Sequence, residues 1–434
     1  MDTTSALRPD GGGWRTEHAY TPAVSGESIL AGQRVAVIYD CLFPYTVGGG
    51  ERWYWRLAEG LRDAGADVTY LTRRQWEEPP ELPGIRVIAV SGRSELYDSN
   101  GRRRLAPTIR FGGGVLRWLL WHRRDYDVVE VANFPFWSVL AVRGALVGAD
   151  VRVVVDWFEI WSMRFWQSYA GKLMGTVGYG VQWACLRLSP RMTVLSESNA
   201  TRLRAICRAD APVVLAGFLP AVVARTDQDD TSMRDERPYV LFAGRHIRDK
   251  GVDLLPEAFA TATRLHPELR FVIAGDGPLR PSVANECRER GLAEIVDLPG
   301  WVSDEDLERL ITGAACVVAP SRREGYGFMP VDAMGKGTPV VTTAFEENLA
   351  VDNIDPGRNG FVVSPPTPGG IASAIAAAVA GGAELRRTTK EWYAEHARTK
   401  TVDCSVSQMV IQHARWANAL STEKDQPLRA VTTV

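Results

Sequence analysis

The chain alternates short apolar segments with longer amphipathic ones along most of its length. The short segments are rich in valine and isoleucine, without polar alternation, which is typical of strands buried on both faces of a parallel sheet. Helical patterns lie between most of them, and one, residues 51–65, ends at a glycine suited to a helix C-terminus. This order predicts doubly wound α/β domains built from βαβ units.

The predicted strands form two groups separated by a polar stretch, residues 218–237, which we interpret as a linker. Before the linker, strands are expected at 34–40, 68–72, 85–90, 127–132, 151–158, 191–196 and 212–217; after it, they are expected at 239–244, 270–275, 294–300, 316–320, 339–343 and 360–365. Two such sheets predict two Rossmann-like domains that face a cleft, which is lined by the loops after the strands. We place these domains at 34–217 and 238–403.

Composition is that of a globular protein, with 45% hydrophobic and 24% charged residues. The net charge of −2 provides no basic field, so a nucleic-acid partner is not expected. Residues 1–33 lack the basic start and apolar core of a signal peptide; they and residues 422–434 are expected to be tails. By inspection, no apolar run reaches the roughly 18 residues that span a bilayer. We therefore expect a cytoplasmic protein.

The loop after the first predicted strand is rich in glycine. Gly48, Gly49 and Gly50 precede Glu51 and an amphipathic helix. Glycines let the backbone approach a ligand closely, and the N-terminus of a helix favours an anion. Contact with a phosphate or a sugar and a plain flexible turn are both compatible with this pattern.

The first loop of the second half carries two cations, Arg245 and Lys250, ahead of a helix. Together they could neutralise a diphosphate, Arg by forked hydrogen bonds and Lys as a compact charge. The alternative is a solvated charged loop, and the position at the predicted cleft favours the phosphate. Two further turns, 272–280 and 298–307, contain glycines where backbone groups could contact a base, or which are ordinary turns.

Two carboxylates follow the strand 316–320. Glu324 lies in a glycine-rich loop, and Asp332 lies eight residues later, about two turns into a helical segment. Eight residues of helix span at most roughly 12 Å, which is close to the reach from a hexose across a diphosphate to a ribose. The pair is too far apart to act on one bond as two glycosidase carboxylates do. Alternatively, Glu324 is a turn residue and Asp332 a solvent-facing helix acid.

Taken together, these motifs resemble family 4 of the glycosyltransferases, retaining enzymes of the two-domain GT-B fold. The matching segments are "GGGE" (48–51), "AGRHIRDKG" (243–251), "AGDGP" (274–278), "EGYGFMPVD" (324–332) and "GTPVV" (337–341). The resemblance runs from about Arg34 to the last helical segment. It implies two Rossmann-like doubly wound parallel-sheet domains facing a cleft, with a C-terminal helix, 404–421 here, that packs back on the N-terminal domain.

The resemblance also implies roles for individual residues. Arg245, Lys250 and Glu324 would be catalytic: the two cations stabilise the leaving diphosphate, and Glu324 contacts the donor sugar. Asp332 stands where the family has a ribose-binding Glu. The other donor-binding residues implied are Gly49, Gly50, Gly275, Trp301, Val302, Gly325, Tyr326, Gly327 and Phe328. Members of the family use no metal, which implies no cofactor beyond the nucleotide-sugar co-substrate; "DYD" at 125–127 is interpreted as a chance match to a metal motif.

Two positions depart from the family pattern. Asp332 is one methylene shorter than the usual Glu, which suits a deoxyribose. Phe158 stands where many relatives have a histidine near the C6 hydroxyl of the donor, and an unpartnered hydroxyl buried there would cost roughly 1–3 kcal/mol. Together they suggest the hypothesis of a dTDP-6-deoxyhexose donor. The alternative is that Asp332 still binds a UDP or GDP ribose and that Phe158 belongs to the core.

The resemblance places the acceptor in the N-terminal domain. The predicted acceptor and sugar pocket consists of Glu51, Trp157, Phe158, Glu159 and Trp161, with Trp157 and Trp161 stacking on a ring or an aglycone. The expected reaction moves a hexose to a hydroxyl of a small molecule, glycan or lipid, as in natural-product or cell-envelope glycoside biosynthesis. Domain closure would exclude water, and the departing diphosphate would itself take the acceptor proton.

Three competing functions remain open on the same fold. One is a UDP- or GDP-hexose transferase that acts on a lipid or polysaccharide acceptor at a membrane. Another is a non-catalytic membrane-docking or scaffold protein, suggested by residues 101–124, in which arginines flank leucines and tryptophans. Such a run is more often a core helix with snorkelling arginines. A nucleotide-sugar epimerase or a phosphorylase is the third.

Overall fold

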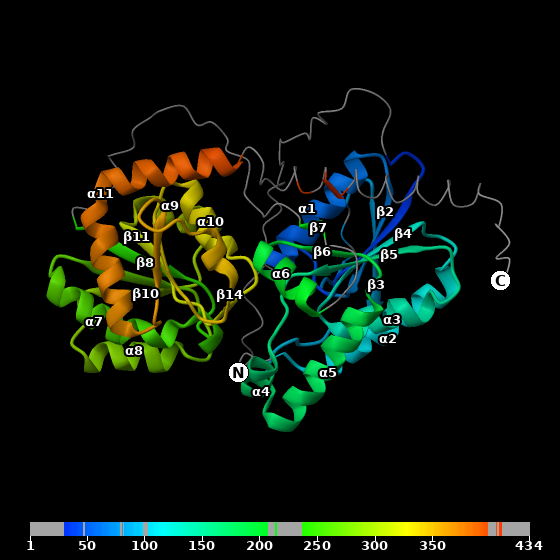
Figure 1. Ribbon diagram of the computed structural model, residues 1–434, viewed down its shortest axis with the longest axis horizontal. Coiled ribbons are helices and arrows are strands. Elements are labelled where there is room, and N and C mark those ends of the chain that lie inside the picture. Colours follow the sequence, from blue (N-terminus) through cyan, green and yellow to red (C-terminus); the bar gives the residue numbers. More distant parts are fainter. Residues whose placement is uncertain are drawn as a thin grey trace, which may run out of the picture.

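The computed structural model describes residues 30–46, 48–78, 80, 82–98, 103–206, 213–214, 237–397, 405, 408 and 409. Two α/β domains lie side by side, each with helices on both faces of a parallel sheet (Figure 1). The predicted linker 218–237 lies outside the described residues except for its last position. The fold is therefore the predicted two-sheet GT-B architecture.

The N-terminal sheet has seven strands in the order β3-β2-β1-β4-β5-β6-β7, with every neighbouring pair parallel. The strands are β1 (Arg34–Ile38), β2 (Asp67–Arg73), β3 (Ile85–Ser91), β4 (Val128–Ala132), β5 (Arg152–Trp157), β6 (Met192–Val194) and β7 (Val213–Val214). The helices are α1 (Gly49–Asp63), α2 (Leu105–His122), α3 (Phe136–Ala145), α4 (Met163–Ala170), α5 (Lys172–Leu188) and α6 (Glu197–Ile206). The strand order reverses between β1 and β4, which is where ligands bind in open sheets of this kind.

The C-terminal sheet has six parallel strands in the order β10-β9-β8-β11-β13-β15. They are β8 (Tyr239–Ala243), β9 (Arg270–Ala274), β10 (Val296–Gly300), β11 (Cys316–Ala319), β13 (Val340–Thr343) and β15 (Gly360–Val363). Its helices are η2 (Arg248–Lys250), η3 (Val252–Leu254), α7 (Leu255–Leu265), α8 (Arg280–Glu289), α9 (Asp304–Gly313), α10 (Phe328–Gly335), η4 (Leu349–Asn353) and α11 (Pro368–Ala397). Here the order reverses between β8 and β11.

A small sheet that the sequence analysis did not predict lies beside the second domain's strands. It pairs β12 (Arg323–Glu324) with β14 (Glu347–Asn348) in parallel. Strands of this length carry too few residues for an apolar pattern, so nothing in the sequence distinguishes them from loop. The pairing fixes the backbone at Glu324.

Apolar packing holds each sheet to its helices. In the N-terminal domain, Phe111 of α2 and Val139 of α3 are buried in one cluster with Val131 of β4. In the C-terminal domain, the rings of Phe259 and Phe271 stack with centroids 4.1 Å apart. A third cluster contains residues of both domains, so the apolar core is continuous across the cleft.

The folded part begins earlier than predicted, and the structure describes only part of the predicted C-terminal helix. Leu30 is buried in the core, and its N–H donates to the carbonyl of Ala64, so ordered structure begins before the predicted boundary at Arg34. Of the predicted helix 404–421, the structure describes Ser405, Gln408 and Met409, all helical, and the Met409 side chain is buried in the cluster shared by both domains. The remainder of that helix lies outside the described residues.

By length and composition, α11 is apolar enough to span a membrane, contrary to the estimate from the sequence. Its side chains Ile371 and Ile375 are instead buried in the core of the C-terminal domain, and Gly382 interrupts the helix with φ 47°. Figure 1 shows α11 wrapping the C-terminal sheet. Within the fold, α11 is therefore a core helix.

Candidate active site

The glycine loop after β1 lies against the second domain. A Cβ atom placed on Gly49 would lie 1.9 Å from the ring of Phe328, at the start of α10. A Cβ on Gly50 would meet the Tyr39 hydroxyl at 2.8 Å. A side chain at Gly49 would therefore block the approach of the α1 N-terminus to the C-terminal domain, whereas Gly50 makes room for Tyr39 within the N-terminal domain. The structure thus places Gly49 and Phe328, two predicted donor-binding residues, in contact.

The loop after β8 positions Lys250 through a left-handed turn. Lys250 ends η2, and Gly251 follows with φ 70°; a Cβ on Gly251 would lie 2.0 Å from the carbonyl oxygen of Pro320. This close approach joins the loop after β8 to the loop after β11. The result is an ion pair between Lys250 Nζ and Glu324 Oε2, 2.5 Å apart.

Lys250 and Glu324 therefore meet at the β8/β11 reversal. Ser321 Oγ also donates to the Glu324 carboxylate, at 3.3 Å. Both side chains of the ion pair are largely but not fully buried, with 29% of Lys250 and 16% of Glu324 exposed. An ammonium group has three donors, so Lys250 can bind Glu324 and a phosphate oxygen at the same time.

Arg245 precedes Lys250 in the same loop, directly after Gly244, and faces the first domain. Its guanidinium stands 5.0 Å from the centroid of the Tyr97 ring, and its charge acts on Glu51 of α1. Burial raises the pKa of Glu51, although a backbone hydrogen bond and Arg103 oppose the rise. Arg245 and Glu51 were predicted for opposite sides of the cleft. In the structure, the charge of Arg245 lowers the pKa of Glu51 and so opposes the effect of burial.

Arg103 and Asp40 form an adjacent ion pair that the sequence analysis did not single out. Asp40 is buried after β1, and the Arg103 guanidinium donates to its carboxylate. Arg103 also lies over the Phe134 ring, 5.0 Å from its centroid. The run of arginines at 102–104 was visible in the sequence, but only the fold brings one of them to the cleft.

Arg323, next to Glu324, connects the two domains. Its guanidinium pairs with Glu159 of the first domain at 2.5 Å and with Asp249 of the second at 2.9 Å. Trp161 Nε1 donates to the same Glu159 carboxylate at 2.7 Å. The Arg323 guanidinium also lies 4.8 Å from the centroid of the Trp161 ring. No motif in the sequence marked Arg323, because its partners lie far away along the chain.

These contacts correct the predicted acceptor pocket. The Trp157 side chain has no exposed surface and belongs to the N-terminal core, so the prediction that it stacks on an acceptor is wrong. Trp161 is 7% exposed and packs against Trp166 and Phe165. Its ring also meets Phe134, Tyr169 and the Arg323 guanidinium, so Trp161 supports the domain contact and does not offer a free ring face. The first correction arises because an aromatic residue at a strand end can turn inward or outward without changing the sequence pattern.

Phe158 is half-buried at the domain contact. Its ring meets Tyr54 edge-on at 5.5 Å and Trp53 edge-on at 6.4 Å. The backbone of Phe158 is also close to the loop that carries Glu324, since a Cβ on Gly325 would lie 3.0 Å from the Phe158 carbonyl oxygen. Phe158 is thus an aromatic residue beside the loop that carries Glu324.

The segment after Glu324 turns sharply into α10. Gly327 has φ 91°, and a Cβ there would lie 2.6 Å from that of Ala350. Tyr326 is buried, and no partner of its hydroxyl is found among the described residues. Helix α10 begins at Phe328, so Asp332 lies just over one turn into it, less than the two turns expected. Burial raises the pKa of Asp332 to about 6, with Arg52 and Lys336 opposing the rise.

The remaining predicted donor residues directly follow β9 and β10. Gly275 has φ 112°, and a Cβ there would lie 2.0 Å from the carbonyl oxygen of Gly244, which explains the glycine. Trp301 is 68% exposed after β10, while Val302 packs against the cluster shared by both domains. Among the described residues, no group of three or more His, Cys, Asp or Glu could hold a metal ion.

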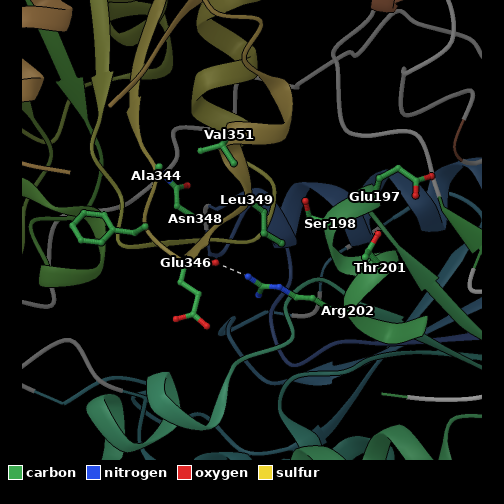
Figure 2. Close-up of a pocket in the computed structure, with 10 residues that line it drawn as sticks. Glu197, Ser198, Thr201, Arg202, Ala344, Glu346, Asn348, Leu349 and Val351 are labelled. Atoms are coloured by element: carbon green, nitrogen blue, oxygen red, sulfur yellow. Dashed lines mark hydrogen bonds between the residues drawn. The ribbon is translucent and has the colours of Figure 1, made fainter. Parts of the chain in front are cut away.

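A separate set of contacts holds the domains together away from these loops. Arg202 of α6 pairs with Glu347 at 2.6 Å. The Arg202 guanidinium also donates to the Glu346 carbonyl (Figure 2). Glu347 also accepts from the Ser162 N–H at 2.9 Å, and Asp352 accepts from the Ser198 hydroxyl at 2.7 Å. Figure 2 shows the hollow between α6 and residues 344–351, which contains none of the predicted site residues.

Comparison with known proteins gives the same assignment as the motifs. Residues 47–216 match the family described as "Glycosyltransferase Family 4", and residues 224–395 match "Glycosyl transferases group 1". The chain is 39% identical over 131 residues to the alpha-D-kanosaminyltransferase of Streptomyces kanamyceticus; the match covers 30% of this chain and 33% of that protein. It therefore spans only a third of this relative.

Solved structures share the fold at low sequence identity. The sucrose-phosphate synthase of Thermosynechococcus elongatus superposes with a TM-score of 0.72 at 19% identity, covering 89% of this chain and all of that one. Anabaena HepE in complex with UDP-glucose gives a TM-score of 0.64 at 17% identity, covering 90% of this chain and 99% of that one. With both halves matched, the chain belongs to the family 4 glycosyltransferases of the GT-B fold.

Proposed function

We propose that the protein is a retaining, metal-independent glycosyltransferase that moves a hexose from a nucleotide-diphosphate sugar to an acceptor hydroxyl. The observation that carries this proposal is the meeting of Lys250 and Glu324 at the β8/β11 reversal, with Gly49 of the opposite domain against Phe328. A cation, a carboxylate and a helix N-terminus are the groups needed to hold a diphosphate and a sugar.

In the proposed reaction, the donor lies along the loops of the C-terminal domain. Lys250 and Arg245 bind the diphosphate and stabilise the negative charge that develops as the anomeric bond breaks. Glu324, held by Lys250 and by the β12–β14 pairing, accepts hydrogen bonds from sugar hydroxyls. The departing phosphate oxygen takes the proton of the attacking acceptor hydroxyl, and the acceptor adds to the face that the phosphate leaves.

We further propose that the donor is a dTDP-6-deoxyhexose. Phe158 supports this, because its apolar ring packs against Tyr54 and Trp53 and its backbone carbonyl lies next to Gly325 in the loop that carries Glu324. A sugar methyl group packs favourably there, whereas a C6 hydroxyl would lose a hydrogen-bond partner. The shorter side chain of Asp332 in α10 supports a deoxyribose at the other end of the donor. The product class that follows is a glycoside of secondary metabolism.

The test is a comparison of kcat/KM for dTDP-rhamnose, UDP-glucose and UDP-N-acetylglucosamine, with nucleoside diphosphate release as the readout. We expect dTDP-rhamnose to be preferred, and Phe158→His to shift the ratio toward UDP-glucose by about tenfold, as one regained buried hydrogen bond would. Phe158→Leu is the matched control, since it stays apolar and should keep the preference. A wild-type preference for UDP-glucose, or a Phe158→His ratio equal to that of Phe158→Leu, contradicts the 6-deoxy assignment.

A second candidate function keeps the same reaction with a UDP- or GDP-hexose donor and a lipid acceptor at a membrane. The observation that favours it is the exposure of apolar side chains on α2, the helix within residues 101–124. The donor comparison distinguishes the two, because a UDP-hexose preference supports this candidate and excludes the dTDP-6-deoxyhexose donor.

A further inference from the structure

Helix α2 has two apolar faces, and only one of them is covered. Phe111, Val115 and Leu119 are fully buried against the N-terminal sheet. Leu120 and Trp121, at the end of the same helix, are 53% and 84% exposed. Core packing therefore explains part of the apolar composition of 101–124 and leaves these side chains without an internal role.

Helix α5 repeats this pattern. Leu173 and Met174 at its start are 78% and 52% exposed, while Cys185 near its end is fully buried. Trp183 is also exposed, with the Arg187 guanidinium 4.2 Å from its ring centroid. Apolar side chains thus reach solvent on two helices that are distant in sequence.

The two helices lie on the same side of the N-terminal sheet. Helix α3 packs against both α2 and α5, and Figure 1 shows the three close together on that face. The second domain has no comparable face: among its described residues, the large apolar side chains that are exposed are Leu265 and Trp301, on different elements. We call the exposed sides of α2 and α5 the α2–α5 face. Exposed apolar side chains gathered on neighbouring helices often mark an interaction site.

The charge of the α2–α5 face indicates what covers it. Residues 99–124 and 160–196 contain no Asp or Glu. Exposed cations stand among the apolar side chains, Arg110 and Arg117 on α2 and Lys172 and Arg187 on α5. Asp125 and Glu95 border α2, but the two helices themselves present exposed Trp and Leu with cations, which suits the interface of a bilayer that carries anionic lipids.

We infer that the α2–α5 face docks on the surface of an anionic lipid bilayer. Trp121, Leu120 and Leu173 would enter the headgroup region, while the arginines contact lipid phosphates. The inference does not depend on the identity of the donor sugar, because none of these residues belongs to the candidate active site. It places the N-terminal domain, which the family resemblance assigns to the acceptor, against the membrane.

Vesicle flotation of the full chain tests this. The probes are phosphatidylcholine vesicles with and without a third of phosphatidylglycerol, at low and high salt. We expect binding to the anionic vesicles that weakens with salt, and a reduction of about tenfold or more in the double variants Leu120→Ser/Trp121→Ser and Leu173→Ser/Met174→Ser. Leu265→Ser is the matched control, since it removes an exposed leucine of α7 and should bind like the wild type.

A charge-only variant, Arg110→Glu/Arg117→Glu, leaves the core untouched and should also lose anionic vesicles. Retained nucleoside diphosphate release in all variants shows that they fold. The inference is overturned if the wild type fails to float with anionic vesicles, if both double variants float like Leu265→Ser, or if the charge variant binds normally. It is also overturned if sedimentation shows a dimer that the same variants dissociate, because a second copy then covers the face.

Discussion

Lys250→Met is the change for which the structure gives the clearest expectation. Methionine keeps the length of the side chain and removes both its charge and its donors. The substitution leaves Glu324, only 16% exposed, with the Ser321 hydroxyl at 3.3 Å and without the ammonium at 2.5 Å. The reaction loses one preorganised cation at the diphosphate, so kcat/KM should fall by at least about a hundredfold, or about 2.7 kcal/mol.

The same change should reduce stability, because it leaves a largely buried carboxylate unpaired. A lost charge-assisted hydrogen bond costs about 1.5–3 kcal/mol of unfolding free energy. Glu324→Gln removes the charge that Lys250→Met leaves unpaired. The stability loss of the double variant Lys250→Met/Glu324→Gln should therefore be smaller than the sum of the losses of the two single variants. Urea unfolding and nucleoside diphosphate release measure the two effects. Turnover of Lys250→Met within about threefold of wild type, or strictly additive stability losses, would refute the assigned pairing and its role.

Three further expectations concern neighbouring residues. Arg245→Ala should lower kcat/KM by at least about a hundredfold with an unchanged melting temperature, because the residue lies in a loop; near wild-type turnover removes it from the diphosphate site. Glu324→Gln should abolish transfer while calorimetry still finds nucleoside diphosphate binding, and an equal loss of affinity for nucleotide and nucleotide sugar contradicts its assignment to the sugar. Burial raises the pKa of Asp332 to about 6, so its carboxylate is ionised above that pH and protonated below it. Nucleoside diphosphate affinity should therefore fall as pH drops from about 7 to about 5, and a parallel fall in Asp332→Asn would show that Asp332 is not the titrating group.

The sequence predicted the parts of this fold that depend on repeated local patterns. All thirteen predicted strands are found in the two main sheets, because strands buried on both faces leave continuous valine-rich runs. The loops that follow them were located for the same reason. Glycines such as Gly251 and Gly275 mark close backbone approaches that other residues cannot adopt.

Contacts between distant side chains were not predictable in the same way. Arg323 pairs with Glu159 across 164 positions of the chain, and neither residue lies in a pattern with a spacing that indicates the other. Trp157 and Phe158 are neighbours on one strand end, yet one is fully buried and the other is half-buried at the domain contact. The register of the strand and the packing of α1 decide which of two adjacent aromatic residues faces the cleft. The amino-acid composition gives no information about either.

Ligand-induced stabilisation tests the central claim most directly. A ligand that binds only the native state at a hundred times its Kd stabilises it by about 2.7 kcal/mol, which raises the melting temperature of a domain of 150–250 residues by about 5–11 °C. In a thermal-shift panel of dTDP, UDP, GDP and their sugars, we predict such a rise for at least one nucleotide, largest for dTDP, in the wild type and a smaller one in Lys250→Met. If no nucleoside diphosphate or nucleotide sugar raises the melting temperature, the strand-end loops of the C-terminal domain are not a donor site and the proposed function is wrong.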